Sequence, residues 1–114
     1  MAVFNGAFPI LPGKEDAARA FAATCVGERR EDFSTQQKKD GTTRETWTMQ
    51  QTPMGAFMLV WFENDDIEGA FEGLATSQDD FMVWLRAQIQ ECTGIDMSAP
   101  DDSPPPELLL DVTT

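Results

Sequence analysis

The sequence predicts an α+β domain in which strands and helices alternate in the order β-α-β-β-α-β. Three observations support this. Segments 3–11 and 43–51 alternate with period two, segment 57–62 is apolar on both faces, and stretches with helical spacing lie between them. The 114 residues, 41% hydrophobic and 25% charged, match a single domain spanning residues 1–114 with one core.

Residues 3–11 predict the first strand, which ends at Pro12-Gly13. Asn5 is a polar residue in this otherwise apolar strand. A helix is expected from Lys14, because small and apolar residues then recur at helical spacing. The polar stretch that follows predicts a further helical turn around Phe33.

The second and third strands are expected to form a hairpin around residues 52–55. In segment 43–51, Trp47 and Met49 share one face and polar residues take the other, which is typical of a sheet edge. Segment 57–62 offers apolar side chains to both faces, so this strand is expected in the centre, covered on both sides.

A second helical region is expected from an acidic cap at Asp65-Asp66, with a break near Thr76 and an end at Gly94. A proline-rich linker follows, and the apolar residues 108–112 predict a fourth strand. This order is the ferredoxin-like arrangement: a four-stranded antiparallel sheet with the first and third strands in its centre and both helices on one face.

One face of such a sheet lacks cover. The third strand has Phe57, Leu59 and Trp61 on one side and Met58, Val60 and Phe62 on the other, so one of these two sets would lie on the uncovered face. Leaving three such side chains in water forfeits roughly 1.5–3 kcal/mol each. We therefore expect a homodimer that packs its two open sheet faces together. The alternative is that segment 98–106 folds back over the same face.

Several motifs support a family resemblance. The element order and the apolar central strand resemble the dimeric α+β barrel superfamily, which includes antibiotic-biosynthesis-monooxygenase-like proteins. Within it, a small bacterial family without an assigned function is the most similar, on the segments Thr43-Arg44-Glu45, Gln51-Thr52-Pro53-Met54-Gly55, Thr93-Gly94-Ile95-Asp96 and Pro105-Pro106-Glu107-Leu108, together with Trp47, Phe81 and Trp84. The resemblance implies a homodimer with a pocket between the sheet and its helices.

Charge and composition exclude several functions. A net charge of −12 argues against nucleic acid and anionic membranes as partners. The absence of histidine removes Ser-His-Asp triads and histidine ligands for zinc or haem. Cys25 and Cys92 match no metal-binding spacing and predict buried free thiols. We expect no metal, no cofactor, no signal peptide and a cytoplasmic location.

The candidate ligand-binding residues come from the aromatic and polar positions nearest the expected pocket. They are Asn5, Arg44, Trp47, Trp61, Phe81 and Trp84. Together they predict a pocket for a small hydrophobic molecule. If Arg44 contributes to the pocket, the ligand is expected to carry a carboxylate, which an arginine binds in a bidentate pair. The alternative is that the aromatic residues only fill the core.

Two other functions remain open from the sequence. Asn5 sits like the first-strand asparagine with which monooxygenases of the resembled superfamily orient substrate or oxygen. This favours a cofactor-independent monooxygenase or isomerase acting on a conjugated ring compound. The other reading is an interaction domain without a pocket.

Overall fold

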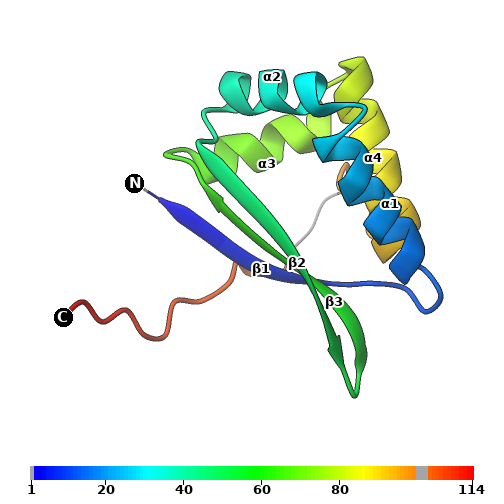
Figure 1. The fold of residues 1–114 in the computed structure, drawn as a ribbon. Helices are drawn as coiled ribbons and strands as arrows, with labels where there is room; N and C mark the ends of the chain where they lie inside the picture. The colour runs from blue at the N-terminus through cyan, green and yellow to red at the C-terminus, as the bar shows by residue number, and fades with distance from the viewer. Residues whose placement is uncertain (1, 100–102) are drawn as a thin grey trace.

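The computed structural model describes residues 2–99 and 103–114. Within them the elements follow the order β-α-α-β-β-α-α (Figure 1). They are β1 (Val3–Pro9), α1 (Glu15–Val26), α2 (Arg30–Asp40), β2 (Arg44–Thr52), β3 (Gly55–Glu63), α3 (Ile67–Thr76) and α4 (Asp80–Thr93). The α+β class is therefore confirmed.

The three strands form one antiparallel sheet in the order β1-β3-β2. Since β1 and β2 each pair antiparallel with β3, they run parallel to each other on its two sides. The apolar strand is central and the half-polar strand is an edge, as the sequence predicts. In the β2–β3 hairpin the Thr52 hydroxyl donates to the Gly55 carbonyl at 2.7 Å, and Gly55 has a φ of 114°, which favours glycine.

The predicted fourth strand and the β-α-β-β-α-β order are wrong. Leu108, Leu109, Leu110 and Val112 are 71–84% exposed, and the tail that carries them extends away from the body (Figure 1). A strand is stabilised by pairing with a neighbouring strand, and an apolar sequence does not by itself provide that neighbour. Without a fourth strand beside it, β1 lies at an edge of the sheet, not in the centre.

The helical regions are each divided in two. α2 is a complete helix where the sequence predicts only a turn around Phe33. Acidic residues Glu31 and Asp32 occupy its first turn and Lys38 and Lys39 its last, which favours the helix dipole. The predicted break near Thr76 separates α3 from α4. No described helix is both long and apolar enough to cross a bilayer.

The four described helices all lie on one side of the sheet (Figure 1). The sheet side chains that face them are mostly apolar: Phe4, Phe8, Trp47, Met49, Met58, Val60 and Phe62. They pack with Ala18, Phe21 and Cys25 of α1 and Cys92 of α4. The other side of the sheet carries Asn5, Thr46, Thr48 and Trp61 around a shallow depression, and the described tail does not cover it.

Candidate functional site

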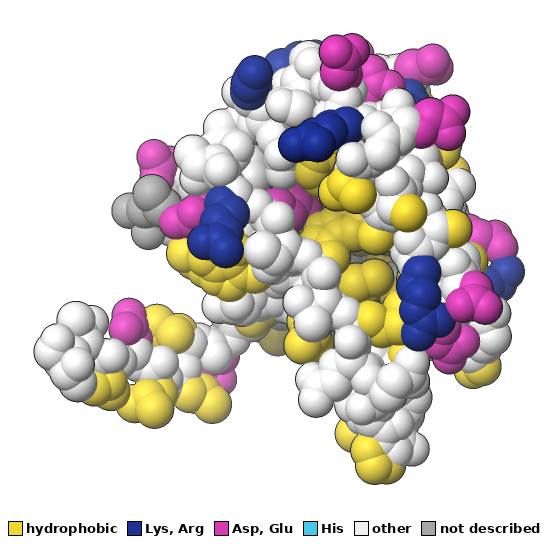
Figure 2. Space-filling model, in the orientation of Figure 1, with side chains coloured by type: hydrophobic (Ala, Val, Ile, Leu, Met, Phe, Trp, Pro, Cys, Tyr) yellow, Lys and Arg dark blue, Asp and Glu magenta, His cyan; other side chains and the backbone are white. Residues whose placement is uncertain are grey.

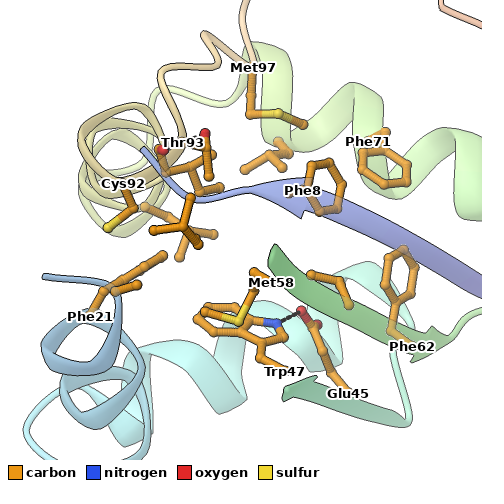
Figure 3. Close-up of a pocket in the computed structure, with 16 residues that line it drawn as sticks. Phe8, Phe21, Glu45, Trp47, Met58, Phe62, Phe71, Cys92, Thr93 and Met97 are labelled. Carbon is orange, nitrogen blue, oxygen red and sulfur yellow. Dashed lines mark hydrogen bonds between the residues drawn. The ribbon is translucent and has the colours of Figure 1, made fainter. Parts of the chain in front are cut away.

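A cavity of about 120 Å³ lies between the sheet and the helices. Figure 3 shows Trp47, Met58 and Phe62 of the sheet facing Phe71, Cys92 and Met97 across it. In Figure 2, hydrophobic side chains gather in a hollow between the helices and the sheet. The lining residues are Phe8, Ile10, Ala18, Phe21, Glu45, Trp47, Met58, Val60, Phe62, Phe71, Leu74, Leu85, Ile89, Cys92, Thr93 and Met97.

Glu45 is the one acidic residue in that lining. Its Oε2 accepts a hydrogen bond of 2.6 Å from the indole Nε1–H of Trp47, drawn as the dashed line in Figure 3. Its Oε1 accepts a longer bond of 3.3 Å from the Gln37 side-chain amide on α2. Burial raises the pKa of the Glu45 carboxyl, the two hydrogen bonds oppose this, and the negative charge of Asp40 raises the pKa further.

The alternation of β2 explains how an acid comes to face the core. Glu45 shares the helix-facing side with Trp47, while Arg44 and Thr46 point to the other side. Its partner on β3 is Phe62, which offers no polar group. Among the described residues no ion pair includes Glu45.

Glu45 and Trp47 also line two neighbouring hollows. One, of about 90 Å³, is bounded by α2 and includes Gln36 and Asp40. The other, of about 240 Å³, lies next to Cys25 on α1. Three hollows thus meet at one carboxylate and one indole.

Asp40 is the second acid near this point. Burial raises the pKa of its carboxyl, while a 3.0 Å hydrogen bond from the Gln36 amide and the charge of Lys39 lower it. The side-chain amide of Asn64, only 3% exposed, donates to the Asp40 carbonyl at 2.8 Å and to Thr42 Oγ1 at 3.0 Å. Asn64 therefore fixes the connection between α2 and β2 just before Glu45.

The six predicted site residues fall into two groups on opposite sides of the sheet. Trp47 lines the cavity, Phe81 lines the α2 hollow, and Trp84 packs against Phe81 and Phe21 at ring distances of 5.6 Å. On the open side, Asn5 pairs with Trp61 of β3, and the Arg44 guanidinium lies 5.5 Å from the Trp61 ring.

The structure therefore brings Trp47, Phe81 and Trp84 together near the cavity and leaves Asn5, Arg44 and Trp61 away from it. Glu45 is the polar residue that the sequence reasoning passed over. The sequence did contain the information, because Glu45, Trp47 and Met49 are alternate residues of one strand and therefore share a face.

The hydroxyl of Thr93, another polar group in the cavity wall, is already engaged. Thr93 Oγ1 donates to the Ile89 carbonyl at 2.7 Å and accepts from the Ile95 N–H at 3.1 Å. Cys92 is a buried free thiol, as is Cys25 nearby, which confirms the prediction for both cysteines. Burial raises the pKa of Cys25 to about 12, so its thiol is protonated near neutral pH.

Comparisons with protein-family models, curated proteins and solved structures found no match to this chain. The chemistry of the site therefore has to be argued from its own residues. Within the described ranges no three Cys, Asp or Glu side chains come together as metal ligands. The arrangement offers an apolar enclosure with one polar anchor, the Glu45–Trp47 pair.

Proposed function

We propose that the protein binds a small, mostly apolar molecule in the cavity between the sheet and the helices. The observation that carries the proposal is the cavity itself: about 120 Å³ of space walled almost entirely by aromatic and aliphatic side chains. Well-packed cores leave few voids larger than a water molecule. Ligand sites, by contrast, are apolar hollows with a small number of polar groups.

The volume limits the size of the ligand. An engineered apolar cavity of roughly 150 Å³ in another protein stays dry and binds benzene. A single ring or a short alkyl chain is therefore the body that this cavity accommodates. A larger ligand would have to extend into the neighbouring hollows next to Glu45.

The cavity does not support a carboxylate on the ligand. No Lys or Arg lines it, and Arg44 lies on the other side of the sheet. The monooxygenase or isomerase reading gains no support either, because Asn5 is also on that other side. Binding is the function that the geometry favours.

The test is thermal unfolding in the presence of toluene, which has no polar group. A ligand that binds only the folded state stabilises it by mass action, so the melting temperature should rise with toluene concentration. Leu74→Phe, which places extra volume in the cavity wall, should reduce this rise. Leu109→Phe makes the same change in the exposed tail and should not. No rise with the unmodified chain would contradict the proposal.

We also propose a homodimer through the open sheet face, the arrangement of the superfamily that the sequence resembles. The face combines Ala7, Leu59 and Trp61 with uncharged polar residues, and its only charges in the described strands are Arg44 and Glu63. A patch with balanced charges allows two copies of a chain of net charge −12 to approach.

Sedimentation at micromolar concentration tests the dimer. Leu59→Glu should give a monomer, because two-fold packing would bury the new charge twice. Leu109→Glu, in the tail, should leave the dimer intact. A monomer for the unmodified chain, or dissociation by the tail variant instead, would contradict packing through the sheet face.

A further inference from the structure

We propose that Glu45 selects the ligand, and that the cavity takes a small hydrophobic amine bound as its cation, with the ammonium group against the Glu45 carboxylate. This rests on the proposed function and names the chemical class that the same cavity prefers. Three features of the site carry it: unused acceptor capacity, a missing counter-charge and aromatic walls.

The Glu45 carboxylate has acceptor capacity left for a ligand. Two carboxylate oxygens accept about four hydrogen bonds in total. The described structure supplies two, from Trp47 at 2.6 Å and from Gln37 at 3.3 Å. Glu45 lines both the cavity and the neighbouring hollow bounded by α2, so a donor at the junction of the two lies beside this carboxylate.

Within residues 2–99 and 103–114, no cationic side chain forms an ion pair with Glu45. The nearby basic side chains are engaged elsewhere. Arg29 pairs with Asp32 at 3.1 Å and lies over the rings of Phe81 and Trp84, and Lys39 pairs with Asp79 at 2.9 Å. A carboxylate in an apolar site without a positive partner is unfavourable, and a ligand ammonium supplies that partner.

The groups that face Glu45 do not offer a substitute. α2 contributes Asp40, which is itself acidic, and α1 contributes the neutral thiol of Cys25. α3 and α4 present apolar side chains to the same region, among them Phe71, Leu74 and Leu85. The raised pKa of Glu45 agrees with a site that lacks a counter-charge.

The aromatic walls suit an organic cation. A cation within about 6 Å of a ring centroid is attracted to the face of that ring. The cavity lining includes Phe8, Phe21, Trp47, Phe62 and Phe71. The net charge of −12 also favours the approach of cations over anions.

Other ligand classes fit less well. A carboxylate would place a second negative charge beside Glu45, which disfavours both ionised groups. A neutral alcohol of the same shape donates a hydrogen bond but brings no charge. We therefore expect affinities in the order amine, then alcohol, then acid.

The experiment compares benzylamine, benzyl alcohol and benzoate by isothermal titration calorimetry at pH 7.5 and fixed salt. Benzylamine should bind at least about ten-fold more tightly than benzyl alcohol, because charge-assisted hydrogen bonds are roughly twice as strong as neutral ones. Glu45→Gln keeps the shape of the side chain and should remove that preference. Glu72→Gln, on the exposed side of α3, makes the same charge change and should preserve it.

The outcomes separate this inference from the proposed function. If toluene raises the melting temperature but the amine shows no preference, or if Glu45→Gln retains it, the ligand class is wrong and the cavity proposal stands. If no probe binds, both fail. Should Glu45→Gln not fold, Trp47→Phe keeps the carboxylate and should keep the preference for benzylamine over benzyl alcohol, while equal affinities would overturn the inference.

Discussion

The indole Nε1–H of Trp47 donates to Glu45 Oε2 at 2.6 Å, and the two residues lie two positions apart on the helix-facing side of β2. β2 thus supplies both an apolar wall of the cavity and the indole that orients the Glu45 carboxylate. This bond holds the carboxylate in one orientation before any ligand arrives, which lowers the entropic cost of binding.

The burial of Glu45 should make stability depend on pH. Its folded-state pKa is raised above 4.5, so the folded state retains the proton longer than the unfolded state. The stabilisation is complete below pH 4.5 and is lost as pH rises through the folded-state pKa.

The variant Glu45→Gln has no carboxyl at this position, so it should not lose this stability as pH rises. Its free energy of unfolding, relative to the unmodified chain, should therefore rise between pH 4.5 and neutral pH, as measured by urea unfolding at each pH. Asp40, whose pKa is also raised, keeps its own contribution in both proteins. A relative stability that stays constant over this range would show that Glu45 has a normal pKa. Glu72→Gln is the matched control and should show no such trend.

Asn64 should be important for stability because it links three segments. Its amide donates to Asp40 and Thr42, and its Oδ1 accepts from the Asp66 N–H at 2.7 Å. Asn64→Ala leaves these groups without partners, so the free energy of unfolding should fall by about 1–3 kcal/mol. Gln90→Ala, at an exposed position on α4, should change it by less than about 0.5 kcal/mol. Equal effects in urea unfolding would refute the role of Asn64.

Phe62 should be a major contributor to the core. It is 7% exposed, and its ring lies 5.1 Å from Phe4 and 5.8 Å from Phe71. Phe62→Ala should lower the free energy of unfolding by about 3–5 kcal/mol, since it removes buried surface and enlarges the cavity. Leu109→Ala in the exposed tail should have almost no effect. A loss below about 1 kcal/mol for Phe62→Ala would mean that the core is packed differently.

Both cysteines should resist thiol reagents while the protein is folded. Burial raises the pKa of Cys25 to about 12 and also raises that of Cys92, so neither forms appreciable thiolate at pH 8. Reaction with a chromogenic disulfide should be slow in buffer and complete in urea. A variant with an exposed cysteine, Thr113→Cys, should react one equivalent at once. Fast labelling of Cys25 in the folded chain would contradict its burial.

Local patterns in the sequence were sufficient for part of the fold. Alternation placed Trp47 and Met49 on one face of an edge strand, and the apolar segment 57–62 is the central strand. The acidic cap at Asp66 is also present, accepting a 3.0 Å bond from the Gly69 N–H. These features depend on neighbours close in sequence or on the pleat of a single strand.

The remaining features depend on distant partners. The apolar residues at 108–112 look like a strand, but no described strand pairs with them, so the four-stranded sheet does not form. The site was predicted only in part for a similar reason. The aromatic site residues were predicted from residue type alone. In the structure Trp47 lies on the helix-facing side of the sheet and Trp61 on the open side. The alternation of side chains along β2 would have placed Glu45 beside Trp47 among the candidate site residues. Its importance becomes evident only from the helices that enclose it.

The most direct test of the account is a methionine-methyl NMR titration with toluene and then with benzylamine. Met58 and Met97 line the cavity, whereas Met54 is 85% exposed in the hairpin. Ring currents from a bound ligand should shift the methyl signals of Met58 and Met97 and leave that of Met54 unchanged. Signals of Met58 and Met97 that stay in place at saturating ligand would contradict binding in the cavity.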